Sequence, residues 1–301
     1  MEQAHINLPV EREGMLDRLI AWGEQQDLVR AMVLTSSRAI PENPYVDVYS
    51  DYDVILALRD VQPFHDRRDW LAAFGTVLAM YADPMEEEDG LKWSANVVQF
   101  EEGLKIDFTL WPVEMLRKVS QQETLPQEFD AGYRVLLDKD GLTAGIKPPS
   151  YHGYIPQPPT EARYREEIEN FFLCATYVAK YLLRDDVMAA KYLLDGEMKH
   201  ENLLPLLEWS IEIEHRWKVT PGNDGRRIKR WLRPERWAAL ESTYAGAGIE
   251  ENWLALFRLM DLMHQVASEV GEAMGFLYPE LIEQRTRSYI MKLKKGHPSP
   301  D

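Results

Sequence analysis

Residues 51–58 read Asp51-Tyr52-Asp53-Val54-Ile55-Leu56-Ala57-Leu58, with an alternating start and a continuous apolar end. This pattern is typical of a strand that enters the interior of a mixed sheet. Side chains two residues apart share a strand face, so we expect Asp51 and Asp53 to lie side by side, with Tyr52 on the other face. Two adjacent carboxylates resist joint ionisation unless a cation lies between them, and the pair therefore predicts a divalent metal site.

A third acid, Asp107, lies in the run Lys105-Ile106-Asp107-Phe108-Thr109-Leu110, which also reads as a strand. An unpaired carboxylate between Ile106 and Phe108 is costly to bury without a partner. If this strand pairs with the Asp51 strand, three carboxylates meet at one edge of the sheet. Mg²⁺ binds a few carboxylate oxygens and completes its shell with water and substrate phosphate. Asp51, Asp53 and Asp107 are therefore candidate magnesium ligands.

The rest of the first half predicts a small mixed sheet flanked by helices. The polar turn at Thr35-Ser36-Ser37-Arg38 follows the first expected strand. The expected strands are residues 29–34, 51–58, 93–100 and 104–111, the last two joined by a turn at 101–103; the expected helices are 10–26 and 65–81, and an acidic loop is expected at 83–89.

A proline-rich stretch, residues 148–159, separates this half from a second one in which helical patterns dominate. We therefore expect an α+β protein with an amino-terminal domain over 1–150 and a carboxyl-terminal helical bundle over 151–301. An apolar stripe along 251–275 is expected to be bundle core, and the tail 292–296 to be frayed. The other expected helices are 161–184, 187–197, 202–215 and 233–244.

Composition narrows the classes of partner. The formal net charge is -16, from 50 acidic and 34 basic residues, which disfavours nucleic acid and favours a small polycation, although excess acid also serves solubility alone. The single cysteine, Cys174, excludes an internal disulfide and a thiolate zinc cluster. Residues 1–9 lack the apolar stretch of an export signal and no segment is apolar enough to span a membrane, so we expect a soluble, cytoplasmic protein.

Three motifs carry a family resemblance. Ser36-Ser37-Arg38, Asp51-Tyr52-Asp53 and Lys105-Ile106-Asp107-Phe108-Thr109-Leu110 resemble, in order and spacing, the Gly-Ser-Arg, Asp-Tyr-Asp and Arg-Ile-Asp-Leu-Thr-Leu elements of the streptomycin (aminoglycoside 6-) adenylyltransferases. Further similar segments extend the resemblance from about Met15 to Tyr278. It implies a nucleotidyltransferase-fold domain, a helical domain, and the transfer of AMP from ATP to a hydroxyl of a cationic aminoglycoside.

The resemblance also implies roles for individual residues. Asp51 and Asp53 would hold magnesium against the ATP phosphates, and Asp107 would be either the general base or a third metal ligand. The Ser36-Ser37-Arg38 turn would bind the nucleotide, with Ser37 on a phosphate oxygen. Arg38 and Lys180 could supply further positive charge to the phosphates. Ser36 departs from the family glycine, and it fits the same turn only if its backbone dihedrals are ordinary.

Contacts to the second substrate are less specific. Glu86 and Glu87, in the acidic run, could face the cationic groups of the drug, although such runs are usually solvated loops. Trp111 could stack on a sugar or guanidinium group, or pack in the core. Two other functions stay open: a nucleotidyltransferase with a non-antibiotic acceptor, and a nucleotide-binding regulator that has lost catalysis, which Ser36 alone supports.

Overall fold

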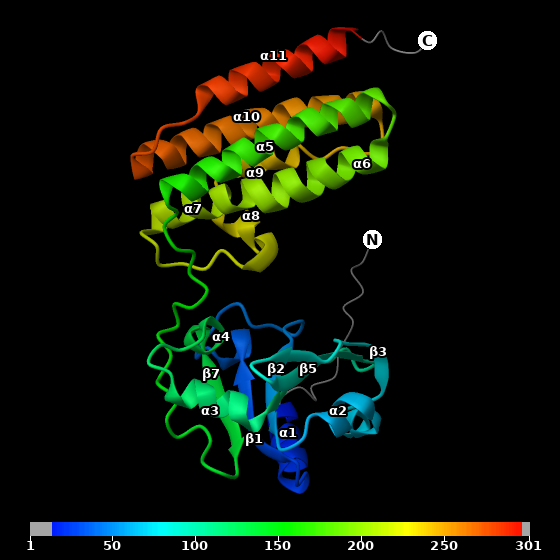
Figure 1. Cartoon of the computed structure of the whole chain (residues 1–301), viewed down its shortest axis with the longest axis vertical. Helices are drawn as coiled ribbons and strands as arrows, with labels where there is room; N and C mark the ends of the chain where they lie inside the picture. Colours follow the sequence, from blue (N-terminus) through cyan, green and yellow to red (C-terminus); the bar gives the residue numbers. More distant parts are fainter. Residues whose placement is uncertain (1–13, 297–301) are drawn as a thin grey trace, which may run out of the picture. The chain divides into compact units, whose positions relative to one another are not determined.

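A seven-stranded mixed sheet forms the centre of the amino-terminal unit in the computed structural model, which describes residues 14–296 (Figure 1). The strand order is β3-β5-β6-β2-β1-β7, with β4 paired to β5. β2 and β6 run parallel, and the other paired strands run antiparallel. The strands are β1 (Val29–Thr35), β2 (Tyr52–Leu58), β3 (Val77–Ala82), β4 (Glu86–Glu88), β5 (Leu91–Phe100), β6 (Lys105–Pro112) and β7 (Tyr133–Asp138).

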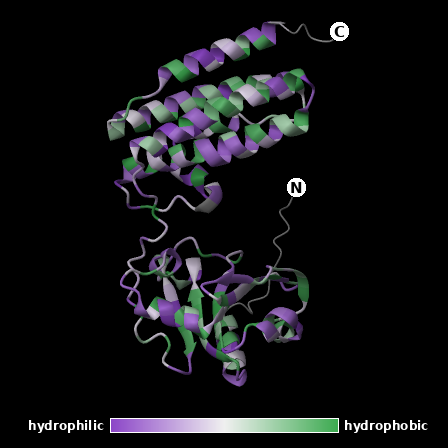
Figure 2. Cartoon of the chain, viewed as in Figure 1, coloured by the Kyte–Doolittle hydropathy of each residue, from purple (hydrophilic) through white to green (hydrophobic). Residues whose placement is uncertain are grey.

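Each face of the sheet has its own apolar core. On one face, Tyr52, Ile106 and Phe108 pack with side chains of α1 (Met15–Gln25) and α2 (Gln62–Asp66). On the other face, Ile55 and Trp111 pack with side chains of α3 (Val113–Gln121) and α4 (Gln127–Ala131). Apolar residues accordingly dominate the central strands (Figure 2). The acids at 53 and 107 alternate with the residues of the first face and therefore lie on the second.

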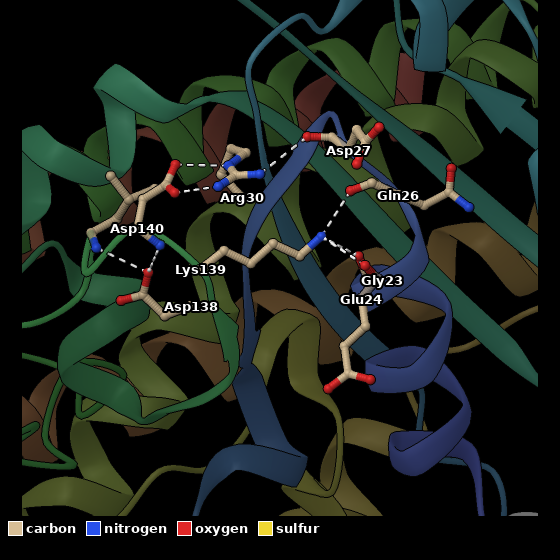
Figure 3. A network of polar contacts seen from close by, with 9 residues as sticks. Gly23, Glu24, Gln26, Asp27, Arg30, Asp138, Lys139 and Asp140 are labelled. Atoms are coloured by element: carbon tan, nitrogen blue, oxygen red, sulfur yellow. Dashed lines mark hydrogen bonds and ion pairs between the residues drawn. The ribbon is translucent and has the colours of Figure 1, made fainter.

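A polar network ties the end of β7 to α1 and β1 (Figure 3). The Lys139 ammonium donates to the carbonyl oxygens of Gly23 at 2.8 Å, Glu24 at 3.1 Å and Gln26 at 2.9 Å. These carbonyls end α1 and lack partners within the helix, so a lysine satisfies them and opposes the negative end of the helix dipole. Arg30 donates from Nε to Asp140 at 2.7 Å on the same side.

The predicted strands and hairpin of this unit are confirmed, and α1 confirms the first helix within the described residues; positions 10–13 lie outside them. The prediction of one helix over 65–81 is wrong. The chain there forms α2, a 3₁₀ turn at Asp69–Ala73 and the edge strand β3. Gly75, with φ of +150°, ends the helical stretch in a conformation that only glycine adopts readily. The acidic loop also contains a short strand, β4.

The chain divides into two units at Tyr154 and Ile155, four residues beyond the expected boundary. Residues 150–153 remain with the first unit because they bond to α4. Asp130 accepts hydrogen bonds from the Ser150 backbone at 2.8 Å and hydroxyl at 2.6 Å, and its carbonyl accepts from the Tyr151 backbone at 2.8 Å. Gly153 packs so closely on α4 that an added Cβ would lie 2.2 Å from the Gln127 carbonyl oxygen.

The second unit is a helical bundle with one large apolar core (Figure 1). The predicted apolar stripe of residues 251–275 is buried on α10, including Leu256, Leu259 and Met263. Cys174 on α5 is buried in the same core. The helices are α5 (Glu161–Leu183), α6 (Val187–Lys191), a π-helix (Tyr192–Leu203), α7 (Leu204–His215), α8 (Ile228–Trp231), α9 (Pro234–Glu241), α10 (Ile249–Met274) and α11 (Glu280–Gly296).

Two expectations for this unit are corrected. Residues 187–215 are helical throughout, with the π-helix between α6 and α7 where a break was expected. The buried Lys199 ammonium holds this segment by donating to the Thr243 carbonyl at 3.0 Å. The tail at 292–296 belongs to α11, which is anchored by the buried Ile290. Within residues 14–296, no helix combines the length and the apolar character needed to cross a membrane.

Candidate active site

Strand pairing brings the three predicted acids together. In the parallel register of β2 and β6, Tyr52 pairs with Ile106 and Asp53 with Asp107. Asp51 immediately precedes β2 and shares the Asp53 face, so it lies beside Lys105 at the same edge. This register confirms the expectation that the strands of Asp53 and Asp107 pair, and it places the three acids on one face of the sheet.

Lys105 bridges two of the acids. Its ammonium nitrogen lies 2.8 Å from Oδ2 of Asp51 and 2.8 Å from Oδ2 of Asp107. Burial alone would lower the pKa of Lys105, but the hydrogen bonds to the two carboxylates outweigh it and raise that pKa. The second oxygen of Asp107, Oδ1, is buried and has no hydrogen-bond partner among the described residues. A buried carboxylate oxygen without a donor is costly and marks a position where a proton or cation would be stabilised.

Asp53 is the acid most affected by its surroundings. Burial raises the pKa of Asp53 to about 6, and the charges of Asp107 and Asp51 contribute in the same direction. The Ser36 hydroxyl opposes this rise, because it donates a hydrogen bond to the Asp53 carboxylate. The site therefore disfavours the ionised form of Asp53, and an added cation would stabilise it.

Ser36 does not have the ordinary dihedrals on which its fit to the turn was expected to depend. Its φ is +62°, in the left-handed region that favours glycine. The turn thus keeps the backbone path that a glycine would take, and the serine adds a hydroxyl that reaches Asp53. The hydroxyl is close to Asp53 because Ser36 directly follows Thr35, which pairs with Asp53 across β1 and β2.

Arg38 holds the backbone that leads into Asp51. Its guanidinium donates to the carbonyl oxygens of Asp47 at 3.1 Å, Ser50 at 2.8 Å and Asp51 at 3.0 Å, and lies 4.1 Å above the Tyr52 ring. These contacts make Arg38 a residue that positions Asp51, in addition to any interaction with phosphate. The sequence pattern alone gave no sign of this role.

The other two candidate nucleotide contacts, Ser37 and Lys180, lie in different units of the chain. Ser37 lies in the 3₁₀ turn Ser36–Ala39, and its carbonyl accepts a 2.9 Å hydrogen bond from Asn43. Lys180 lies on α5 in the second unit, 5.3 Å from the centre of the Tyr177 ring. The assignment of Lys180 to the nucleotide remains a prediction.

The structure separates the candidate substrate contacts from the acids. Trp111 is 8 % exposed and stacks on Phe129 at 6.0 Å, so it belongs to the core, the second of its two expected roles. Glu86 and Glu87 are exposed on β4, where Glu86 pairs with Trp93 of β5. Trp93 lies four residues along β5 from Val97, the partner of Asp107, which corresponds to about 13 Å.

The three acids offer the hard oxygen ligands that Mg²⁺ prefers. Asp107 Oδ1 lacks a partner within the described chain, and burial followed by the charges of Asp107 and Asp51 raises the pKa of Asp53, so the residues fit a divalent cation. Within residues 14–296, however, no three His, Cys, Asp or Glu side chains are already arranged to hold a metal. The Lys105 ammonium forms ion pairs with Oδ2 of Asp51 and Oδ2 of Asp107.

Two further features adjoin the acids. An open pocket borders Asp51 and Lys105 and is also lined by Tyr49 and Gln99. On the other side, burial raises the pKa of Tyr154, with contributions from the charges of Glu128 and Asp53. Sequence reasoning missed these neighbours and the role of Lys105. The period-two spacing of Lys105 and Asp107 was the signal that could have shown the latter.

The chain is similar to known proteins over nearly its whole length. The family model described as streptomycin adenylyltransferase matches residues 10–293. An aminoglycoside 6-adenylyltransferase of Bacillus subtilis (strain 168) is 29% identical over 279 residues, which cover 91% of this chain and 95% of the relative. One from Campylobacter jejuni is 26% identical over 283 residues, 93% of this chain and 95% of the relative.

A solved structure is also similar. The crystal structure of an aminoglycoside 6-adenyltransferase from Bacillus subtilis aligns with 93% of this chain and 97% of its own, with a TM-score of 0.46 and 25% identity. The family match extends over almost the whole chain and includes all three motifs that carried the resemblance. This chain belongs to the streptomycin adenylyltransferase family of nucleotidyltransferases.

Proposed function

We propose that this chain transfers AMP from ATP to a hydroxyl of a cationic aminoglycoside such as streptomycin, releases pyrophosphate and uses Mg²⁺ as its cofactor. Membership of the family supports the reaction class, and the relatives at 29% and 26% identity carry the name aminoglycoside 6-adenylyltransferase. The observation that carries the proposal is the pairing of Asp53 with Asp107 across β2 and β6, with Asp51 beside them.

In the proposed reaction, Asp51 and Asp53 hold the metal. Bound there, Mg²⁺ supplies positive charge that stabilises the negative charge developing on the phosphate oxygens. The acceptor hydroxyl oxygen bonds to the α-phosphorus of ATP, and the bond from that phosphorus to pyrophosphate breaks. Asp107 receives the hydroxyl proton, a role that suits a buried oxygen, Oδ1, with no donor in the described part of the chain.

The neighbouring residues fix the acids for this chemistry. Arg38 holds the backbone at Asp51 through its bonds to Ser50 and Asp51, and Ser36 holds the Asp53 carboxylate. Preorganisation of this kind removes the need to reorient the groups during reaction. The backbone at Ser36, with a φ in the left-handed region that glycine favours, argues against the impaired regulator, because the serine adopts the kind of conformation for which glycine is suited.

The acceptor is proposed from charge and family together. With a formal net charge of -16, the chain attracts small polycations and repels polyanions. Aminoglycosides carry several ammonium or guanidinium groups, so their encounter with the protein should weaken as ionic strength rises.

A pyrophosphate-release assay tests the proposal. Purified protein, ATP and Mg²⁺ are combined with streptomycin and, separately, with a panel of other aminoglycosides. We expect release that depends on both metal and drug. ATP turnover with none of the drugs but with a cell metabolite extract would favour the non-antibiotic acceptor. No turnover under any condition would contradict the proposal.

A further inference from the structure

Lys105 is the charged residue of the site that the proposed chemistry does not use. Its side chain is 29% exposed, comparable to 31% for Asp51 and 27% for Asp107, so all three are open to solvent ions. Within residues 14–296, the ammonium forms ion pairs with Asp51 and Asp107, the acids that the proposed function assigns to the metal and to the proton.

The sheet geometry explains why the lysine lies there. Lys105 and Asp107 are two residues apart on β6 and share a face, while Asp51 and Asp53 hold the matching positions at the start of the parallel neighbour β2. The four side chains, one cation and three anions, thus lie as neighbours on one face of the two paired strands. Without the lysine, three carboxylates would face one another, two of them on directly paired residues.

An ammonium and a divalent cation are both attracted to these carboxylates. The Lys105 nitrogen lies 2.8 Å from Oδ2 of Asp51 and 2.8 Å from Oδ2 of Asp107. A cation bound by Asp51 must approach that carboxylate within about 2.1 Å, in space that the ammonium now takes. Two cations repel each other and cannot both take this position.

We infer that Lys105 is a positioning residue that competes with the divalent metal for these carboxylates. It holds Asp51 and Asp107 together in the metal-free protein, and it gives up its contact with Asp51 when the metal binds. This inference rests on the proposed function only for the identity of the metal's partner, a nucleoside triphosphate.

Competition of this kind makes metal binding depend on nucleotide. Mg²⁺ at protein sites usually keeps one or two carboxylates and takes its remaining ligands from water and substrate phosphates. Without nucleotide, the metal must displace the Lys105 ammonium while the carboxylates are its only ligands from the protein. The metal with a triphosphate brings additional ligands, and the phosphates also attract the released ammonium.

The test measures Mn²⁺ binding to the full chain by electron paramagnetic resonance or calorimetry, with no nucleotide present. Lys105→Met is expected to lower the Mn²⁺ Kd at least about tenfold relative to the wild type, because two ion pairs no longer oppose binding. Lys118→Met is the matched control: it removes a lysine that pairs with Asp89 at 2.9 Å, causing the same change in net charge at a pair that includes none of the three acids.

Two further variants locate the effect. Lys105→Arg keeps the positive charge and should keep the weak binding of the wild type. Asp51→Asn in the Lys105→Met background should reverse the gain, because the tighter site uses Asp51. A Kd for folded Lys105→Met equal to or higher than that of the wild type would overturn the inference, as would an equal gain in Lys118→Met.

The loss of the lysine can also unfold the site, since three acids would then face one another. Thermal unfolding with and without Mn²⁺ decides this case. Recovery of the Lys105→Met fold by Mn²⁺ supports the inference, because the metal then replaces the ammonium. If Mn²⁺ does not recover it, Lys105→Gln, which keeps a hydrogen-bond donor, is measured instead. A lowered Kd for that variant supports the competition, and an unchanged Kd overturns it.

Failure of this inference is distinguishable from failure of the proposed function. Mn²⁺ binding is measured without ATP or drug, so it gives a result even if no aminoglycoside is modified. Conversely, normal AMP transfer in the wild type together with unchanged Mn²⁺ affinity in Lys105→Met would leave the proposed function standing and remove only the role of Lys105.

Discussion

Asp53 lies directly opposite Asp107 in the parallel pairing of β2 and β6. Residues paired in this way have their side chains on the same face, a few ångströms apart. Asp51 joins them from the turn that Arg38 holds in place.

Asp53→Asn and Asp107→Asn should each reduce AMP transfer by about a thousandfold or more while the protein stays folded. The amides keep the shape of the acids and lose the charge that a metal or proton requires. Turnover is measured by pyrophosphate release, and folding by circular dichroism. Asp66→Asn, at an exposed acid on α2, is the control and should keep wild-type turnover. Full activity in either site variant would remove that acid from the mechanism.

Ser36→Gly and Ser36→Ala separate the two properties of Ser36. Both remove the hydroxyl that donates to Asp53, but only glycine relieves the left-handed backbone at φ of +62°. Ser36→Gly should therefore exceed Ser36→Ala in free energy of unfolding by about 1 kcal/mol. Chemical denaturation measures this difference, and equal stability would show that the turn carries little strain.

The same two variants should shift the pH dependence of activity. The Ser36 hydroxyl lowers the pKa of Asp53, which burial has raised to about 6, so its removal raises that pKa further. Because Asp53 must be ionised to hold a metal, turnover should fall more at pH 6 than at pH 8. A uniform loss across this range would mean that the hydroxyl does not act through Asp53.

Glu208 on α7 should make stability depend on pH. Burial raises the pKa of Glu208 to about 7, and the charges of Asp224 and Glu212 add to it. A carboxyl whose folded-state pKa lies above its ordinary value of 4.5 stabilises the fold fully below pH 4.5, and this contribution is lost as the pH rises through 7.

Glu208→Gln stays neutral at every pH, so the difference in unfolding free energy between wild type and variant should change by about 2 kcal/mol between pH 4.5 and pH 8. The variant gains relative to the wild type at the higher pH. Urea denaturation at several pH values measures this change. Glu214→Gln, at an exposed position on the same helix, should not show it. A constant difference for Glu208→Gln would contradict the assignment.

Gly153→Ala should destabilise the first unit by about 1–3 kcal/mol. The added Cβ would lie 2.2 Å from the Gln127 carbonyl oxygen and 2.6 Å from the Ala131 amide nitrogen, and backbone atoms cannot move aside as a flexible side chain would. Gly196→Ala is the control, since no atom lies within 4 Å of its added Cβ. Wild-type stability in Gly153→Ala would show that residues 150–153 do not pack on α4 as described.

Sequence reasoning reached the acids because their signal is local. Period-two spacing places Asp51 beside Asp53, and an isolated acid between Ile106 and Phe108 requires a nearby partner. The contacts of Lys105 and Arg38 were missed because they depend on side-chain conformations and on a turn whose path the sequence leaves open. Ser36 shows the same limit, since only the folded turn reveals its left-handed backbone.

The wrong prediction of one helix over residues 65–81 has a similar cause. Trp70, Leu71 and Phe74 recur at helical spacing and do pack in the core beside the sheet. However, Trp70 and Leu71 belong to a short 3₁₀ turn that ends before Phe74, and Gly75 then starts the path into β3. Apolar spacing reports which residues face the core, and several backbone paths satisfy it. Edge strands such as β3, with mostly exposed side chains, give a weak pattern of their own.

The most direct test of the account is mass spectrometry of streptomycin after incubation with ATP, Mg²⁺ and either wild-type protein or Asp53→Asn. We predict an adduct of one AMP on the drug with the wild type, none without Mg²⁺, and none above background with the variant. An adduct formed equally well by Asp53→Asn, or formed without a divalent metal, would contradict the claim that the paired acids of β2 and β6 bind the metal for nucleotide transfer.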